Sequence, residues 1–271
     1  MSLIKNCINK HPLLIYFILV FIISWGVIFL LAGPSGFPVT EQQAMKLGMA
    51  ILLGPSVAGI LLIGLFSGRS GYRDLLSRLL KWRVEIRWYA VALLTAPLST
   101  AAVIILLSFF SSEFHPSIFL SDEKTTLLML AIMGGLTVGI FEELGWTGFA
   151  VPIMKRLHGV VISGIIIGLI WGAWHFPLFW ETSSFTSFFS FSLLIVKLFS
   201  WLTPYRVLMV WVYEHTESLF LIILMHVILV ATLLTLDPTV TGGGLLIFIL
   251  VRAIILWGFV GVVAFPRSRA V

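Results

Sequence analysis

The amino-acid sequence predicts an all-α fold, a polytopic bundle of about eight transmembrane helices. Of its 271 residues, 59% are hydrophobic and 11% are charged, and the mean hydropathy is +1.09. In a soluble domain about a quarter of the residues are charged. The apolar residues form runs of about 20, the length that an α-helix needs to cross a hydrocarbon core of about 30 Å. No stretch alternates apolar and polar residues as half-buried strands do.

The loops between the apolar segments are short, so the sequence predicts one transmembrane domain over residues 1–271. The first segment follows two lysines but lacks a cleavage site of small residues, and we interpret it as a retained span. The sixth is interrupted by Lys197, Pro204 and Arg206. The eight predicted spans cover residues 12–32, 46–66, 88–110, 126–150, 159–180, 188–212, 217–236 and 244–265.

Basic residues indicate the orientation of the spans. With the N-terminus in the cytoplasm, the cytoplasmic segments hold thirteen lysines and arginines, whereas the opposite loops hold only Lys46 and Lys124. This asymmetry follows the positive-inside rule, and an even number of spans places both termini in the cytoplasm. The thirteen are Lys5, Lys10, Arg69, Arg73, Arg78, Lys81, Arg83, Arg87, Lys155, Arg156, Arg206, Arg267 and Arg269.

We therefore expect a multi-pass integral protein of the plasma membrane, with membrane lipids among its partners. The net charge of +5 is explained by topology and does not indicate nucleic-acid binding. The single cysteine, Cys7, excludes an intrachain disulfide and a multi-cysteine zinc site. Residues 69–88 mix arginines with leucines. They form either an amphipathic helix along an anionic leaflet or an ordinary cytoplasmic loop, and both interpretations remain open.

Two adjacent glutamates, Glu142 and Glu143, follow the apolar run 127–141. A carboxylate at the centre of a bilayer costs a few kcal/mol even on lenient scales, so a pair indicates a function. Neighbours on a helix point about 100° apart, so one glutamate can face a cavity while the other braces it. Two close carboxylates in a low-dielectric site do not both ionise easily, which suits general acid–base catalysis. The alternative is a polar pair that only links helices.

Two histidines lie in later spans. The fourth and fifth spans predict a hairpin with its turn at residues 155–159, which places Glu142 and His175 at similar depth, each about 25 Å of helix from the turn. Trp171, one turn before His175, is expected to form an apolar wall beside it. His226 lies only nine residues into its span, so it meets the others only if helices tilt or extend. An aromatic-belt position for His175 and a helix–helix hydrogen bond for His226 are the alternatives.

These residues fit two mechanisms of amide hydrolysis. In one, His175, His226 and Glu142 hold Zn²⁺ with an open position for water. In the other, a glutamate activates water without a metal and the histidines stabilise the oxyanion. HExxH, GxSxG, P-loop and GxGxxG motifs are absent from the sequence, which argues against soluble zincins, serine hydrolases, P-loop nucleoside triphosphatases and dinucleotide-binding enzymes.

The chain resembles the CPBP, or Abi, family of intramembrane proteases, which includes the type II CAAX prenyl endopeptidases. Its glutamate-pair motif reads Glu142 to Gly148, its aromatic–histidine motif reads Trp171 to His175, and a later span carries His226. Residues 54–56 and the basic stretch before Trp88 also look like the family, so the similar core covers about 50–235.

The resemblance implies an eight-helix fold with a conical cavity and peptide-bond hydrolysis near the membrane interface. It implies catalytic roles for Glu142, Glu143, His175 and His226, supporting roles for Trp171 and Thr147, and a peptide or protein substrate that can carry a lipid. It leaves Zn²⁺ open.

The chain departs from the family pattern at two positions. Thr147 occupies the position at which the family has an arginine, so Glu143 is expected to have only a hydroxyl as its neighbour one turn later. Val230 occupies the position, four residues after the last histidine, at which the family commonly has a polar residue. This difference removes an oxyanion donor. A catalytically inactive member that acts as a binding, immunity or scaffold protein is therefore the alternative. A transporter with a glutamate proton relay is a third interpretation, although the two halves show no matching broken helices.

Overall fold

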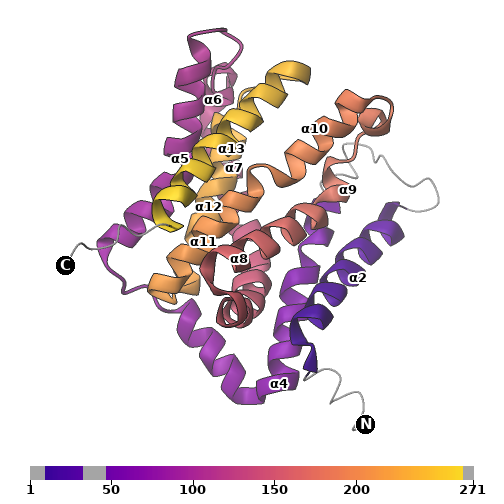
Figure 1. The fold of residues 1–271 in the computed structure, drawn as a ribbon, viewed down its shortest axis with the longest axis vertical. Helices are drawn as coiled ribbons and strands as arrows, with labels where there is room; N and C mark the ends of the chain where they lie inside the picture. The colour runs from indigo at the N-terminus through magenta and orange to yellow at the C-terminus, as the bar shows by residue number, and fades with distance from the viewer. Residues whose placement is uncertain (1–9, 33–46, 265–271) are drawn as a thin grey trace.

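The computed structural model describes residues 10–32 and 47–264. Within these residues the secondary structure is entirely helical, which confirms the predicted fold class. The helices form an elongated bundle (Figure 1). In chain order they are α2 (Pro12–Ala32), α4 (Leu53–Leu79), α5 (Ile86–Ser108), α6 (Ser117–Leu120), α7 (Lys124–Gly145), the π-helix η2 (Trp146–Ala150), α8 (Val151–Trp174), α9 (Phe176–Phe179), the 3₁₀-helix η3 (Thr182–Phe185), α10 (Phe188–Phe199), α11 (Leu202–Thr216), α12 (Leu219–Leu236) and α13 (Gly242–Ala264).

Seven helical segments of the described chain are long and apolar enough to cross a membrane, against the eight predicted. The difference arises because helical structure runs without interruption through residues 124–174, which joins the predicted fourth and fifth spans. The chain nevertheless reverses within this segment, since Trp171 contacts Glu142. Gly159, with φ +71°, kinks α8 inside the residues where the turn was predicted. Lys5, Cys7, Lys46, Arg267 and Arg269 lie outside the described residues.

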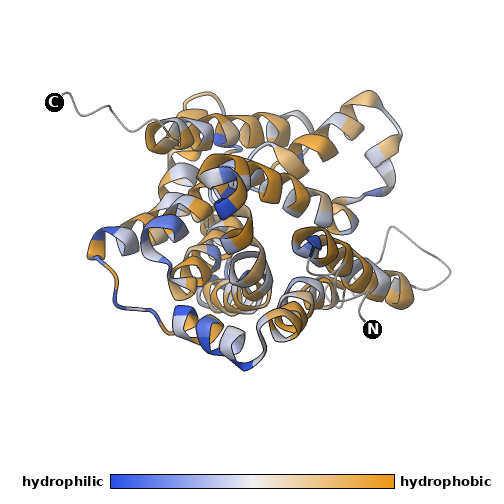
Figure 2. Ribbon diagram, turned by 60° about the horizontal axis from the view of Figure 1, so that its bottom comes forward, coloured by the Kyte–Doolittle hydropathy of each residue, from blue (hydrophilic) through white to orange (hydrophobic). Residues whose placement is uncertain are grey.

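The long helix α4 bends sharply at Gly68, where φ is +55° (Figure 1). The part after the bend, through Leu79, is a helix rather than the loop of the alternative interpretation. It presents Leu75 to the core, where this side chain is 7% exposed, while Arg69 and Arg73 are exposed. Figure 2 shows hydrophilic residues concentrated along this part of the chain, whereas most of the bundle is hydrophobic.

Glycines allow two pairs of helices to approach closely. Gly135 and Gly139 of α7 face α12, and a Cβ on Gly135 would lie 2.6 Å from the Val227 carbonyl oxygen. Gly164, Gly168 and Gly172 of α8 face α10 and α11. Small residues four apart are a recurrent device for packing helices in membranes. These two interfaces bring α7, α8, α11 and α12 together, and the candidate site lies among them.

Two basic residues in the predicted spans have carboxylate partners outside them. Lys197 of α10 lies 2.6 Å from Glu181, and Arg252 of α13 donates to Asp237 at 2.9 Å. Arg252 is only 3% exposed, so its pairing follows the rule that charges in a bilayer are neutralised. Large apolar side chains elsewhere face outward, for example Leu30, which is 83% exposed, as expected of surfaces that contact lipid.

Candidate active site

The glutamate pair occupies the end of α7, just before the π-helix η2. Glu142 is 1% exposed and Glu143 is 0% exposed. The Oε2 atom of Glu142 accepts hydrogen bonds from two indole N–H groups, from Trp171 at 2.6 Å and from Trp146 at 3.2 Å. Its Oε1 atom has no protein hydrogen-bond partner in the part of the chain that the structure describes. One oxygen is thus fixed and the other is available.

Both oxygens of Glu143 are fixed by neighbouring side chains. Arg206 Nη1 lies 3.0 Å from each carboxylate oxygen. His226 Nδ1 lies 2.8 Å from Oε1, and the hydroxyl of Thr147 donates to Oε2 at 2.5 Å. Because a carboxylate accepts and does not donate, His226 carries its proton on Nδ1 and leaves Nε2 available. Glu143 therefore orients the ring of His226 through this hydrogen bond, which agrees with different roles for two glutamates that point about 100° apart on the helix.

Arg206 is the residue of this site that sequence reasoning missed. It was assigned to the cytoplasmic side, but it is 0% exposed inside α11. Its guanidinium lies 4.1 Å from the centroid of the Trp171 ring. The Thr147 hydroxyl does lie one turn after Glu143, as predicted, but it is not the only partner, because a cation reaches the carboxylate from another helix. An arginine within a predicted apolar span was the signal, since such a residue needs an acidic partner.

His175 lies at the end of α8 and is held in an aromatic wall. Its Nδ1 lies 2.8 Å from the Trp171 carbonyl oxygen, so Nδ1 donates and Nε2 is the unprotonated nitrogen. Its ring makes edge contacts with Trp171 and Trp174 at centroid distances of 5.4 and 4.8 Å. The hairpin places Trp171, rather than His175, directly against Glu142. Trp171 is thus a hydrogen-bond donor as well as the apolar wall that was predicted.

The three predicted zinc ligands do not form a metal-binding group. Among the described residues there is no cluster of three or more His, Cys, Asp and Glu side chains that could hold a metal ion. The indole of Trp171 contacts both histidines, with its ring centroid 5.4 Å from that of His175 and 5.5 Å from that of His226. In this arrangement the donors do not fit a zinc site, and we assign no step to a metal.

Outer contacts hold these helices in place. The hydroxyl of Tyr205, next to Arg206 on α11, donates to the Met225 carbonyl oxygen at 3.1 Å, beside His226 on α12. The indole of Trp174 donates to Ser24 of α2 at 2.9 Å, and Ser24 donates to the Ile51 carbonyl oxygen at 2.6 Å. The positions of the histidines are therefore supported from both sides of the site.

Comparisons with known proteins agree with this geometry. The family model described as type II CAAX prenyl endopeptidase, Rce1-like, matches residues 124–232. A protein of Methanococcus maripaludis named CAAX prenyl protease 2 is 25% identical over 266 residues, which cover 92% of this chain and 94% of that protein. From α7 into α12 the chain is therefore similar to the type II CAAX prenyl endopeptidases, and over most of its length it is similar to the archaeal protein.

The similarity agrees with the position of the site. The seven helical segments that are long and apolar enough to cross a membrane indicate an integral membrane protein. The matched region begins with α7 and ends within α12, so it contains Glu142, Glu143, His175, Arg206 and His226. Thr147 and Val230 also lie within it. The helices before and after this region supply the outer contacts.

Proposed function

We propose that this protein is an intramembrane endopeptidase in which Glu142 activates a water molecule to hydrolyse a peptide bond near the membrane interface. The observation that carries the proposal is the state of the Glu142 carboxylate, buried with one oxygen held by two indoles and the other without a protein partner. A group held in this way is positioned to take a proton in a site from which bulk water is excluded.

The reaction needs only water and the peptide. Glu142 takes a proton from water as the water oxygen attacks the carbonyl carbon and the carbonyl oxygen becomes an oxyanion. The same carboxyl then returns the proton to the amide nitrogen as the carbon–nitrogen bond breaks. The products are a carboxylate and an amine, and Glu142 is ready for another cycle.

The histidines contact the water or the substrate through their Nε2 atoms in this proposal. Glu143 fixes the ring of His226, and the backbone of Trp171 fixes the ring of His175. Both rings lie against the indole of Trp171, whose Nε1 holds Glu142. Trp171 thereby fixes the spacing between base and histidines, a form of preorganisation that strengthens electrostatic catalysis.

Arg206 supplies a candidate for the oxyanion donor that Val230 does not provide. Its Nε and Nη2 atoms are buried and have no hydrogen-bond partner among the described residues. Unpaired buried donors are costly, so their presence beside a catalytic carboxylate favours a ligand that pairs with them. A guanidinium N–H aimed at a developing oxyanion would lower the barrier by a few kcal/mol, as single oxyanion donors do in other hydrolases.

The substrate class in this proposal is a peptide with a lipidated end, because the related archaeal protein is named as a CAAX prenyl protease. The membrane in which the protein acts is proposed to be the plasma membrane. The conical cavity that the family resemblance implies would admit the peptide from the lipid side.

The test is cleavage of quenched peptides, with and without a prenyl group, by protein purified in detergent. We expect Glu142→Gln and His175→Ala to lose cleavage while they remain folded, and Glu123→Gln, an exposed glutamate of the same region, to retain it. A chelator decides the metal question, since loss of activity that Zn²⁺ restores would establish a zinc enzyme. Equal turnover by wild type and Glu142→Gln would refute the mechanism. No cleavage by any stable variant would favour the non-catalytic binding role.

A further inference from the structure

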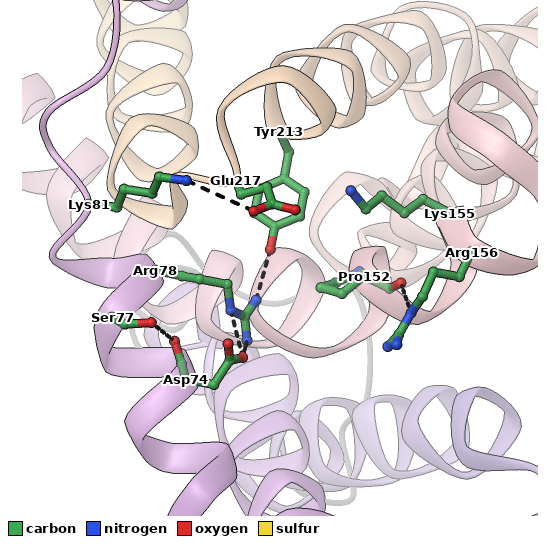
Figure 3. Close-up of a pocket in the computed structure, with 9 residues that line it drawn as sticks. All are labelled: Asp74, Ser77, Arg78, Lys81, Pro152, Lys155, Arg156, Tyr213 and Glu217. Atoms are coloured by element: carbon green, nitrogen blue, oxygen red, sulfur yellow. Dashed lines mark hydrogen bonds and ion pairs between the residues drawn. The ribbon is translucent and has the colours of Figure 1, made fainter.

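A cavity of about 510 Å³ lies at the basic end of the bundle, away from the candidate active site. Its walls come from the end of α4, the start of α8 and the end of α11 (Figure 3). None of the proposed catalytic residues lines it. The nine lining residues are Asp74, Ser77, Arg78, Lys81, Pro152, Lys155, Arg156, Tyr213 and Glu217.

Cations exceed carboxylates in this lining by four to two. Arg78 is paired with Asp74 at 2.9 Å and also donates to the Tyr213 hydroxyl at 3.0 Å. Lys81 is 3.9 Å from Glu217, a weak contact between exposed groups. Lys155 pairs at 2.6 Å with Glu214, a carboxylate outside the lining.

Arg156 differs from the other three cations. Its Nε donates to the Pro152 carbonyl oxygen at 2.9 Å, while its two terminal nitrogens have no hydrogen-bond partner among the described residues. The exposed side chain therefore offers the four N–H groups of its two terminal nitrogens and a positive charge at the cavity. A guanidinium group whose two terminal nitrogens are unpaired is well suited to bind phosphate, because it can donate two parallel hydrogen bonds.

A second cavity, of about 300 Å³, adjoins the first and shares Asp74, Arg78, Pro152 and Arg156 with it. Its remaining walls are mostly apolar. Ile63 and Phe66 come from α4 before the Gly68 bend, while Phe149 and Ile153 come from η2 and α8. A basic compartment therefore opens beside an apolar one, with Arg156 at their boundary.

We propose that the two cavities together bind one anionic phospholipid, with its phosphate against Arg156 and an acyl chain against Phe66, Phe149 and Ile153. The paired compartments match the two parts of such a molecule in charge and polarity. Basic residues at the membrane surface attract anionic lipid headgroups. The bend at Gly68 folds the basic part of α4 toward α8 and so forms the cavity wall.

The proposed lipid site is connected to η2, the π-helix that follows the glutamate pair. Arg78 Nη2 donates to the Gly148 carbonyl oxygen of η2 at 3.0 Å. A lipid in the two cavities would contact Arg78 and hold α4 against η2 and α8. We therefore expect bound lipid to stabilise the fold, independently of whether the protein cleaves peptides.

The test compares phosphatidylglycerol with phosphatidylcholine. Native mass spectrometry measures how much of each lipid the protein retains, and thermal unfolding in detergent measures how much each lipid stabilises it. We expect wild type to retain phosphatidylglycerol preferentially and to be stabilised by it. Arg156→Gln should bind it about tenfold more weakly, since one charge-assisted hydrogen bond is worth about 1.5 kcal/mol or more. Arg69→Gln, which removes an exposed arginine of α4 outside both cavities, is the matched control and should bind normally.

Four results would overturn the proposal. Equal retention of the two lipids would show that the headgroup charge is not recognised. Equal weakening by Arg156→Gln and Arg69→Gln would reduce the effect to general surface charge. Stabilisation by inorganic phosphate as strong as by phosphatidylglycerol would assign the cavity to free phosphate, and displacement of the lipid by a prenylated peptide would assign it to the substrate. Because each readout is binding or stability, none depends on protease activity.

Discussion

At the scale of single residues, Arg206 and Thr147 together replace one side chain of the family motif. Thr147 lies one helical turn after Glu143 and donates a hydroxyl hydrogen bond to it. Arg206, 63 residues after Glu143 in the chain, supplies the positive charge from α11. A buried carboxylate needs a neutralising partner, but the partner can arrive from any helix that packs against it. The positive charge that the family resemblance implies one turn after Glu143 is therefore supplied here by a different helix.

This exchange predicts a compensating pair of substitutions. Arg206→Met should destabilise the fold by about 3–5 kcal/mol, because it leaves the Glu143 carboxylate buried without a guanidinium. Thr147→Arg alone should also destabilise it, since two guanidinium groups would then crowd one carboxylate. The double variant should be more stable than either single variant and should regain activity, because a cation at position 147 can pair with Glu143 one turn away.

Thermal stability and peptide cleavage of the four proteins form a double-mutant cycle that measures this coupling. Losses that simply add would mean that positions 147 and 206 act independently, and the exchange would be refuted. Leu136→Arg serves as a control for a new charge on the same helix, and Arg206→Met should not rescue it.

At the scale of helices, the site depends on how closely α7 and α12 approach. A Cβ on Gly135 would collide with the backbone of Val227, the residue after His226, whereas a Cβ on Gly134 would meet only a Leu234 methyl at 3.9 Å. Adjacent glycines on one helix thus have opposite environments. Only one of them should be needed for the packing that brings His226 to Glu143.

We predict that Gly135→Ala destabilises the protein by about 1–3 kcal/mol, since its Cβ would lie 2.6 Å from a backbone oxygen that cannot rotate away. Gly134→Ala should be neutral or stabilising by up to about 1 kcal/mol, because alanine favours the helix. Thermal unfolding in detergent distinguishes them, and cleavage should fall with Gly135→Ala alone. Similar behaviour of the two variants would mean that α7 and α12 do not touch at this point.

At the scale of the whole molecule, hydropathy was sufficient to predict a helical membrane bundle, and sequence spacing was sufficient to predict the hairpin that returns to Glu142. The spacing argument succeeded because a helix rises by a constant amount per residue and Gly159 lies midway. It did not reveal that Trp171, rather than His175, would contact Glu142. The helix axes at the turn set this register, and their angle is not encoded in residue counts.

The part of the site that could not be predicted is the part that depends on packing between distant helices. His226 was expected to reach the site only through tilt or extension, and glycine interfaces bring its helix against α7. Arg206 comes from a segment that breaks between α10 and α11, so its depth could not be read from span length. Pairings of this kind are determined by side-chain volumes at helix crossings, which a single sequence does not display.

The orientation of the bundle stays a prediction, and it determines which leaflet meets the basic cavity. In a Cys7→Ser background without other cysteines, Ser70→Cys and Ser183→Cys each place one exposed thiol, on α4 after its bend and on η3. Because basic loops remain in the cytoplasm, a membrane-impermeant maleimide should label Ser183→Cys in intact cells and Ser70→Cys only after permeabilisation. The reverse pattern would invert the topology and move the basic cavity to the outer leaflet. Labelling of both variants in intact cells would contradict a single orientation altogether, and the positive-inside argument would then fail for this chain.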